Sequence, residues 1–211
     1  MQTAILLYDN FTALDAVGPY EVLSRIPGSE IVFVATNPGP IRTDMTSLAL
    51  TADASLTDIT SPDILLVPGG PGCAELLNDE PVLDWIRQAD TTTTWTTSVC
   101  SGSLLLAAAG LLTGKRATSH WICMELLEAF GAIPTSERVV LDGKHATAAG
   151  VSAGIDLALH LTGLLTSDRI AQSIQLVLEY DPQPPYNTGS ITKAPPPLVT
   201  ALRKTNLTIT A

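Results

Sequence analysis

The segment Asp63–Val67, with the sequence DILLV, is an almost wholly apolar run that stops at Pro68-Gly69-Gly70-Pro71-Gly72. A strand that is apolar on both faces must be covered on both sides, which is typical of parallel sheets. Residues 4–7, 30–35 and 95–99 also favour short strands bounded by turn residues. We therefore expect a mostly parallel sheet between two layers of helices.

Helical patterns alternate with these strands along the chain. Asp142-Gly143 predicts a hairpin between residues 138–141 and 145–148. The alternation predicts an α/β fold formed by residues 1–211 as a single domain, with a proline-rich C-terminal tail from about residue 181. In such sheets, ligands bind beyond the carboxyl ends of the strands. The predicted helices are residues 14–26, 73–77, 81–88, 101–109, 119–130, 152–165 and 168–178.

Charge and composition exclude several classes of function. The net charge is −10 and the 11 basic residues are scattered, so neither nucleic acid nor an anionic membrane surface is an expected partner. Charged residues make up only 15% of the chain, against about 25% in soluble domains. Part of the apolar surface is then expected to be covered by a second copy, most simply in a homodimer.

Targeting and redox signals favour the cytoplasm. The first ten residues have no basic stretch typical of a signal peptide, and no apolar run approaches the ~18 residues of a membrane span. The three cysteines, Cys73, Cys100 and Cys123, are an odd number without metal-ligand spacing. We therefore expect no disulfide framework, no metal site and no cofactor.

Cys100 stands between the predicted strand 95–99 and the small, apolar helix 101–109. This position, with Gly102 two residues later, is the cysteine counterpart of the G-x-S-x-G nucleophile turn, although Ser98 replaces the first glycine. A helix N-terminus favours thiolate, so we expect a lowered pKa for the Cys100 thiol. The alternative is a small, buried, structural cysteine.

Two other turns follow predicted strands. The glycines after Asp63–Val67 allow backbone N–H groups to approach a ligand, as an oxyanion site requires, although an ordinary glycine-rich turn is the simpler interpretation. Asp15 follows the first strand and fits the start of a helix equally well. His120, His145 and His160 are interpreted as structural, because none directly follows Cys100 to serve as its base.

Together these turns resemble the DJ-1/PfpI superfamily and, within it, the isonitrile hydratase branch. The resemblance rests on stretches that span nearly the whole chain: LDAVGPYEVLSRIPG (14–28), DILLVPGGPG (63–72), TSVCSGSLLLAAAGLLTGKRATSHW (97–121), FGAIPTSERVV (130–140), AGVSAGIDLAL (149–159) and QLVLEYDPQPPYNTGS (175–190). It implies a flavodoxin-like sandwich with a mostly parallel sheet and a nucleophile elbow. Some transcription factors of this superfamily share parts of these motifs.

The resemblance also implies a role for individual positions. Cys100 matches the nucleophile and Asp15 the carboxylate beside it, where other members carry glutamate. Gly69 and Gly70 match the oxyanion turn, and Val151 matches an apolar residue of the pocket. Ser101 falls where the hydratases usually have threonine, which keeps the hydroxyl and loses the χ1 restraint.

The implied reaction is hydration of an isonitrile, R–N≡C, to an N-substituted formamide without a metal or organic cofactor. Attack by the Cys100 thiolate, with a proton supplied by Asp15, gives a covalent thioimidate that water then resolves. Two alternatives stay open. One is another activity of the superfamily, glyoxalase-like or hydrolytic, and the other is a cysteine-based sensor of oxidation or of a ligand.

Overall fold

A computed structural model describes residues 1–205 of the chain. Its central sheet has seven strands in the order β10-β11-β7-β6-β1-β2-β5, all parallel except β10, which runs antiparallel to β11. The predicted fold class, a mostly parallel α/β sandwich, is thereby confirmed. The strands of this sheet are β1 (Gln2–Leu6), β2 (Glu30–Ala35), β5 (Ala54–Ser55), β6 (Ile64–Val67), β7 (Trp95–Val99), β10 (Val139–Asp142) and β11 (His145–Ala148).

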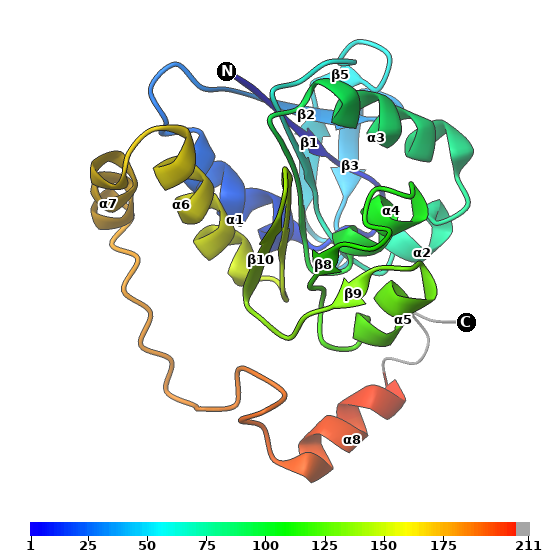
Figure 1. Cartoon of the computed structure of the whole chain (residues 1–211), viewed down its shortest axis with the longest axis vertical. Coiled ribbons are helices and arrows are strands. Elements are labelled where there is room, and N and C mark those ends of the chain that lie inside the picture. The colour runs from blue at the N-terminus through cyan, green and yellow to red at the C-terminus, as the bar shows by residue number, and fades with distance from the viewer. Residues whose placement is uncertain (206–211) are drawn as a thin grey trace.

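Two small two-stranded sheets accompany the central one. In the first, β3 (Gly39–Arg42) pairs with β4 (Ala49–Ala52), and in the second β8 (Arg116–Ala117) pairs with β9 (Ile133–Pro134). Helices cover both faces, with α1, α6 and α7 on one side and α2 to α5 on the other (Figure 1). The helices are α1 (Ala13–Leu23), α2 (Cys73–Leu76), α3 (Glu80–Thr92), α4 (Gly102–Ala108), α5 (Met124–Ala129), α6 (Ala153–Leu165), α7 (Asp168–Val177) and α8 (Pro196–Thr205).

The apolar strands lie in the core, as their composition requires. All four residues of β6 are buried, and so are Ala4, Ile5 and Leu6 of β1 beside it. Because β1 pairs with β2 on one side and β6 on the other, the chain changes winding direction at β1. The carboxyl ends of β1, β6 and β7 therefore meet at the sheet edge where ligands bind in this architecture.

The C-terminal tail leaves the body of the molecule and carries α8, a helix that the sequence patterns did not predict (Figure 1). None of its residues is buried, and it reaches the body through Arg203, which pairs with Glu125 and lies 5.6 Å from the ring centre of Trp121. That residues 1–211 form a single domain stays a prediction, and residues 206–211 lie outside the described part.

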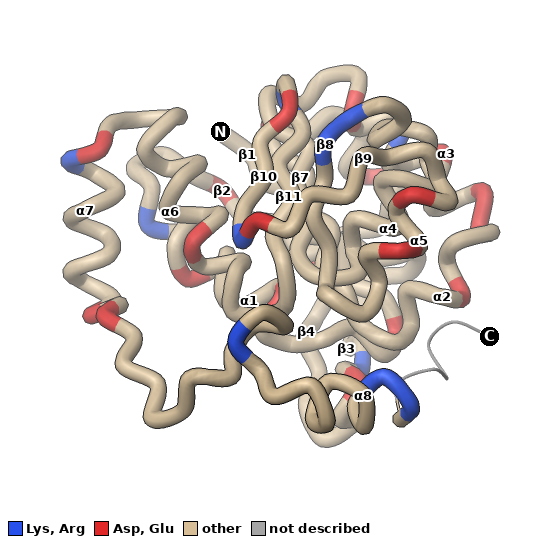
Figure 2. The backbone as a smooth tube through the Cα atoms, turned by 60° about the horizontal axis from the view of Figure 1, so that its bottom comes forward, with Lys and Arg blue, Asp and Glu red and all other residues tan. Residues whose placement is uncertain are grey.

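Charged residues are spread over the body, with acidic positions on several helices and loops (Figure 2). Within residues 1–205, no helix is both long enough and apolar enough to span a membrane. Over the same residues, no three His, Cys, Asp or Glu side chains are grouped as a metal ion would require.

Candidate active site

Cys100 occupies a sharp turn between β7 and α4. Its φ of 58° lies in the left-handed region, which a side chain adopts only when the surroundings hold it there. Its backbone N–H is held by the carbonyls of Ala148 (3.1 Å) and Ala149 (2.9 Å) at the end of β11. Gly102 permits the turn, because a Cβ there would lie 2.1 Å from the Val67 carbonyl oxygen. The predicted strand, turn and helix around Cys100 are thus confirmed, and the thiol is placed at the ligand-binding edge.

Asp15 lies in the first turn of α1 and is fully buried. Its Oδ2 accepts a hydrogen bond from the Gly69 N–H at 2.9 Å, while Oδ1 has no partner of ordinary geometry within residues 1–205. Burial raises the pKa of Asp15 to about 7, although the Gly69 N–H and a hydrogen bond from the Cys100 thiol both lower it. Asp15 can therefore gain or lose a proton near neutral pH, which a catalytic acid and base requires.

The prediction of a lowered thiol pKa is wrong. Burial raises the pKa of Cys100 well above its ordinary value, and the negative charge of Asp15 raises it further. The backbone N–H groups of Val151 and Ser101 act in the opposite direction and lower the thiol pKa, as an elbow at a helix start provides. With only 7% of the residue exposed, desolvation outweighs these two donors. At neutral pH the Cys100 side chain is therefore a thiol rather than a thiolate.

Ser101 joins the turn at Cys100 to the glycine turn after β6 by a hydrogen bond. Its Oγ accepts a hydrogen bond from the Gly70 N–H (3.0 Å) and lies 3.3 Å from the Gly70 carbonyl oxygen. The Gly69 carbonyl in turn accepts a bond from the Thr12 N–H at 2.8 Å. Side chains are excluded at this turn, since a Cβ on Gly69 would lie 2.5 Å from the Ser101 nitrogen. The turn is rigidly positioned against Cys100.

The backbone N–H groups of Gly69 and Gly70 are already used within the protein. Both N–H groups, expected as oxyanion donors, already donate within the protein, one to Asp15 and the other to Ser101. They position the carboxyl and the hydroxyl, and neither is available to a substrate anion in this structure. The N–H groups that favour negative charge on the Cys100 sulfur are those of Val151 and Ser101.

Val151 forms part of the apolar wall beside the thiol. It packs against the cluster that contains Val99, Cys100 and Ala148, and its φ of 24° turns the backbone between β11 and α6 so that its N–H faces the sulfur. The sequence assigned Val151 only to this apolar wall. The donor role of its backbone depends on a conformation that no sequence pattern indicates.

Two side chains near the elbow were not predicted. The Ser119 hydroxyl donates to the Cys100 carbonyl at 3.0 Å, and the buried Tyr8 hydroxyl donates to the Pro68 carbonyl at 2.8 Å. The predicted helix 119–130 is shorter in the structure, where α5 begins at Met124. Ser119 therefore lies in the segment before the helix. Tyr8 lies two residues after the end of β1, and its place beyond the carboxyl end of a central strand was the available signal.

The three histidines contact other parts of the molecule than the Cys100 thiol. His120 packs against Gly150, where a Cβ would lie 2.9 Å from its ring, and burial lowers its pKa. His160 is exposed on α6. His145 begins β11, so it lies at the other end of the strand from Cys100. Within residues 1–205, none of the three forms a hydrogen bond with the Cys100 sulfur, in keeping with their interpretation as structural.

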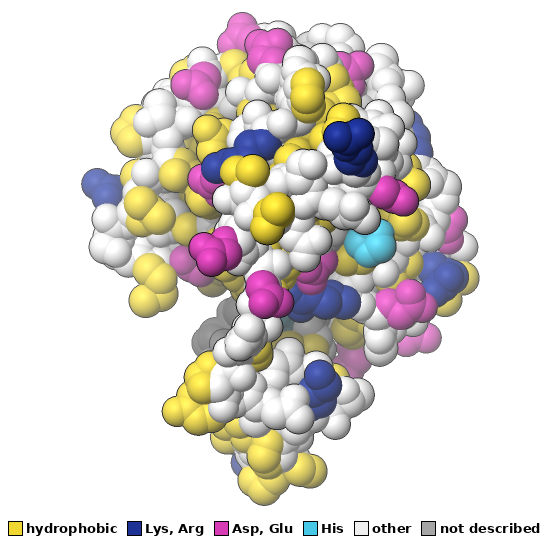
Figure 3. All heavy atoms as spheres, turned by 90° about the vertical axis from the view of Figure 1, so that its left-hand side faces the viewer, with side chains coloured by type: hydrophobic (Ala, Val, Ile, Leu, Met, Phe, Trp, Pro, Cys, Tyr) yellow, Lys and Arg dark blue, Asp and Glu magenta, His cyan; other side chains and the backbone are white. Residues whose placement is uncertain are grey.

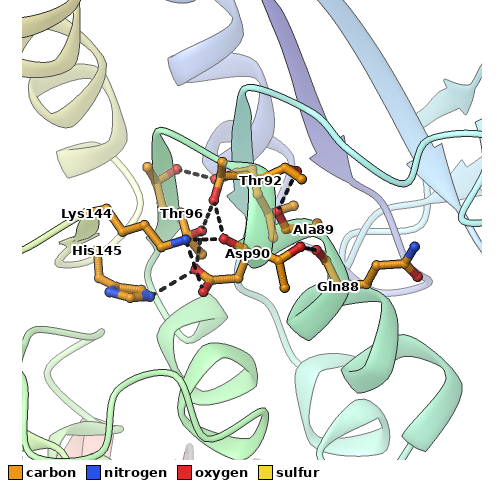
Figure 4. A network of polar contacts seen from close by, with 11 residues as sticks. Gln88, Ala89, Asp90, Thr92, Thr96, Lys144 and His145 are labelled. Atoms are coloured by element: carbon orange, nitrogen blue, oxygen red, sulfur yellow. Dashed lines mark hydrogen bonds and ion pairs between the residues drawn. The ribbon is translucent and has the colours of Figure 1, made fainter.

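His145 belongs to a separate polar network at the amino ends of β7 and β11 (Figure 4). Asp90 is its centre and contacts His145 Nε2 (3.0 Å), the Thr96 hydroxyl (2.6 Å) and Lys144 Nζ (3.2 Å). Burial raises the pKa of Asp90, but the bonds from Thr96 and Lys144 and the charge of His145 lower it overall. This network joins α3 to the sheet and is distinct from the Cys100 edge.

The chain is similar in sequence and in fold to several known proteins. The model of the DJ-1/PfpI family matches residues 1–163. An isonitrile hydratase from Pseudomonas putida is 44% identical over 97% of this chain and 89% of its own length. A crystal structure of a ThiJ/PfpI family protein from Pseudomonas syringae, 40% identical, superposes with a TM-score of 0.93 over 97% of this chain and 85% of that one.

The transcriptional regulator GbdR of Pseudomonas aeruginosa is also similar, at 31% identity over 83% of this chain. The match covers half the length of that regulator.

Proposed function

Because this chain belongs to the DJ-1/PfpI family, we propose that it is an isonitrile hydratase that needs no cofactor and converts R–N≡C and water into R–NH–CHO. The 44% identity to the Pseudomonas putida isonitrile hydratase over nearly the whole of both chains supports this reaction. The structural observation that carries it is the buried Cys100–Asp15 pair, in which a nucleophile and a carboxyl with a pKa of about 7 lie together.

The burial of the pair limits the class of substrate. Cys100 is 7% exposed and Asp15 is fully buried, so only a small molecule or the slim end of one can reach the sulfur. The surroundings of the thiol are Val99, Ala148 and Val151, which favour a neutral, apolar group. The terminal carbon of an isonitrile meets both requirements, whereas a peptide carbonyl meets neither.

The first step is proton transfer within the pair. The thiol passes its proton to the Asp15 carboxylate as its sulfur attacks the terminal carbon, and the N–H groups of Val151 and Ser101 stabilise the charge that forms on sulfur. Attack places an electron pair on that carbon, and protonated Asp15 delivers the same proton there. A C–S bond and a C–H bond have then formed, and the product is a thioimidate, R–N=CH–S–Cys100.

The second step adds water to this intermediate. Asp15, again a carboxylate, takes a proton from water as the oxygen attacks the thioimidate carbon, and the nitrogen receives that proton. The tetrahedral R–NH–CH(OH)–S adduct then breaks its C–S bond. Asp15 moves the hydroxyl proton to the departing sulfur, which releases the formamide and restores the thiol. The carboxyl acts as base and as acid in each step, for which a pKa near 7 is well suited.

Ser101 and the glycine turn have positioning roles in this proposal. Gly69 holds one oxygen of Asp15 through its N–H, so the other oxygen is directed to the exchanged proton. Ser101 fixes Gly70 and thereby the distance between the turn and the elbow. Since the charge created by attack is quenched by a proton on carbon, the reaction does not require the oxyanion donors expected at Gly69 and Gly70.

The alternatives are less well supported by the site. A hydrolase of the cysteine–histidine type needs an imidazole bonded to the sulfur, and the carboxyl of Asp15 occupies that place. A peroxide sensor needs an accessible thiolate, whereas Cys100 is buried and its pKa is raised. A glyoxalase-like activity is separated from hydration by direct assay.

The assay offers the pure protein a short aliphatic isonitrile in one reaction and methylglyoxal in another, and follows the products by proton NMR. We expect the N-alkylformamide from the first reaction, no lactate from the second, and loss of formamide formation in Cys100→Ala. Conversion of methylglyoxal without hydration of the isonitrile would contradict the proposal.

We also propose that the protein is a homodimer in the cytoplasm. Leu164, Leu176 and Val177 on α6 and α7 are 59%, 80% and 73% exposed, and apolar side chains gather on this face (Figure 3). An exposed apolar face of this kind is suited to a second copy of the chain. All three cysteines are free thiols, which fits a reducing compartment.

A further inference from the structure

Tyr8 is buried beside the site without touching the proposed reacting atoms. It follows β1, is 7% exposed, and packs edge-on against Phe11 with ring centres 6.4 Å apart. Its hydroxyl donates a hydrogen bond to the Pro68 carbonyl at 2.8 Å. A buried hydroxyl with one well-formed bond is held in a single orientation, so this contact fixes the carbonyl as well.

The Pro68 carbonyl and the Gly69 N–H are the two ends of one peptide group. The N–H end donates to Asp15 Oδ2 at 2.9 Å. Tyr8 and Asp15 are therefore hydrogen-bonded to opposite ends of the same peptide group. Because a peptide group is planar and polarisable, a donor on its oxygen fixes the direction of its N–H and strengthens that N–H as a donor. The effect is greatest in a buried environment such as this one.

We propose that Tyr8 is a positioning residue for Asp15, acting through the Pro68–Gly69 peptide to orient and strengthen the backbone hydrogen bond that Gly69 donates to the Asp15 carboxylate. The inference rests on the proposed function for its catalytic meaning, since there Asp15 moves the proton. Its geometry stands without that function. Tyr8 acts as a donor throughout the neutral range, because burial and the nearby Cys73 and Asp15 raise its pKa well above 10.0.

The titratable groups around Asp15 come from several elements. Cys100 lies at the turn between β7 and α4, Tyr8 just after β1, and Asp44 between β3 and β4. Asp44 Oδ2 accepts a hydrogen bond from the Thr12 hydroxyl at 2.8 Å. The charge of Asp44 raises the pKa of Asp15, after the larger effect of burial and against the lowering by Gly69 and Cys100. Replacing Tyr8 leaves each of these groups in place, so a change at Asp15 can be assigned to the peptide.

The test follows the carboxyl carbon of Asp15 by ¹³C NMR between pH 5 and pH 9, in the wild type and in Tyr8→Phe. Loss of the donor weakens the Gly69 N–H, destabilises the carboxylate and moves the Asp15 inflection upward by about 0.5 pH unit. Tyr20→Phe is the matched control, because Tyr20 packs elsewhere. Its ring centre lies 5.5 Å from the ring centre of Phe33. The Asp15 inflection of this control should stay at the wild-type position.

Incorporation of 3-fluorotyrosine at position 8 gives a second, opposite test that hardly alters packing. The fluorinated phenol is a stronger donor, so the Asp15 inflection should move downward. Opposite shifts for the two substitutions support the proposal, and an unchanged inflection in either overturns it. Because the readout needs no substrate, absence of isonitrile hydration would refute the proposed function without affecting this result.

Discussion

The thiol of Cys100 and the carboxyl of Asp15 influence each other's ionisation in opposite directions. After burial, the charge of Asp15 is what most raises the pKa of the thiol, whereas a hydrogen bond from the thiol favours the ionised form of the carboxyl. Above pH 7, the resting pair is therefore a thiol beside a carboxylate. In the proposed reaction, Cys100 becomes a thiolate by transferring its proton to Asp15 when substrate is present, and the same proton is then available for the substrate.

Replacement of Asp15 by asparagine should flatten the dependence of stability on pH. The pKa of Asp15 is raised from 3.8 to about 7 on folding, so its stabilising protonated form is fully present below pH 3.8 and is lost as the pH rises through 7. Between pH 5 and pH 8, the free energy of unfolding of the wild type should fall by about 3 kcal/mol because of Asp15 alone. Urea unfolding of the wild type and the variant at both pH values measures this difference.

In the same comparison, Asp15→Asn should lose isonitrile hydration, because the amide cannot exchange a proton with Cys100. Parallel pH–stability curves for the wild type and the variant would show that the carboxyl is not protonated on folding. Unchanged turnover would remove Asp15 from the reaction.

Ser101→Ala should lower the free energy of unfolding by about 1–3 kcal/mol, because the Gly70 N–H is then buried without its acceptor. Ser101→Thr keeps the hydroxyl and restrains χ1, so it should retain the wild-type stability and turnover. Chemical denaturation of the three proteins distinguishes them. If the threonine and alanine variants behave alike, the hydroxyl is not what joins the two turns.

Gly69→Ala should distort the site, because the new Cβ would lie 2.5 Å from the Ser101 nitrogen and 2.8 Å from Cys100 Cβ. We expect a loss of about 1–3 kcal/mol in stability and of at least about tenfold in formamide formation, since backbone must move. Gly189→Ala is the control, with no atom within 4 Å of the added carbon. Equal activity in the two variants would refute the tight approach of turn and elbow.

Asp90→Asn should separate stability from activity. Its partners His145, Thr96 and Lys144 lose a charged acceptor, so unfolding should require about 1–3 kcal/mol less free energy. The network lies at the opposite end of β7 from Cys100, so the rate of formamide formation at 25 °C should stay within about twofold of wild type. A tenfold loss of turnover in a folded variant would mean that the two ends are coupled.

The sequence predicted the layers of this fold and the place of its site because both depend on local patterns. An apolar run such as Ile64–Val67 can only be buried, and a strand followed by a small, apolar helix defines the turn at Cys100. Asp15 and Ser101 came from the resemblance of their segments to a known family. The structure brings both of them to Cys100 and to the glycine turn.

The thiol pKa, the occupied N–H groups and the bond between Tyr8 and Pro68 were beyond prediction for a physical reason. Each depends on contacts between segments far apart in the chain: Gly69 with Asp15, Gly70 with Ser101, and Tyr8 with Pro68. A helix start favours thiolate locally, but burial by distant segments decides the outcome. Helix α8 was missed because its prolines indicated only an irregular tail, although a proline in the first turn of a helix is well tolerated.

In the proposed reaction, Cys100 forms a covalent thioimidate with the isonitrile while it is paired with Asp15. The most direct measurement mixes the protein with a short isonitrile, quenches within milliseconds and locates the adduct by peptide mass spectrometry. We predict a mass increase of one isonitrile molecule on Cys100 in the wild type and in Cys123→Ala, and neither adduct nor formamide in Cys100→Ala. Formamide production by Cys100→Ala at the wild-type rate would rule out Cys100 as the nucleophile.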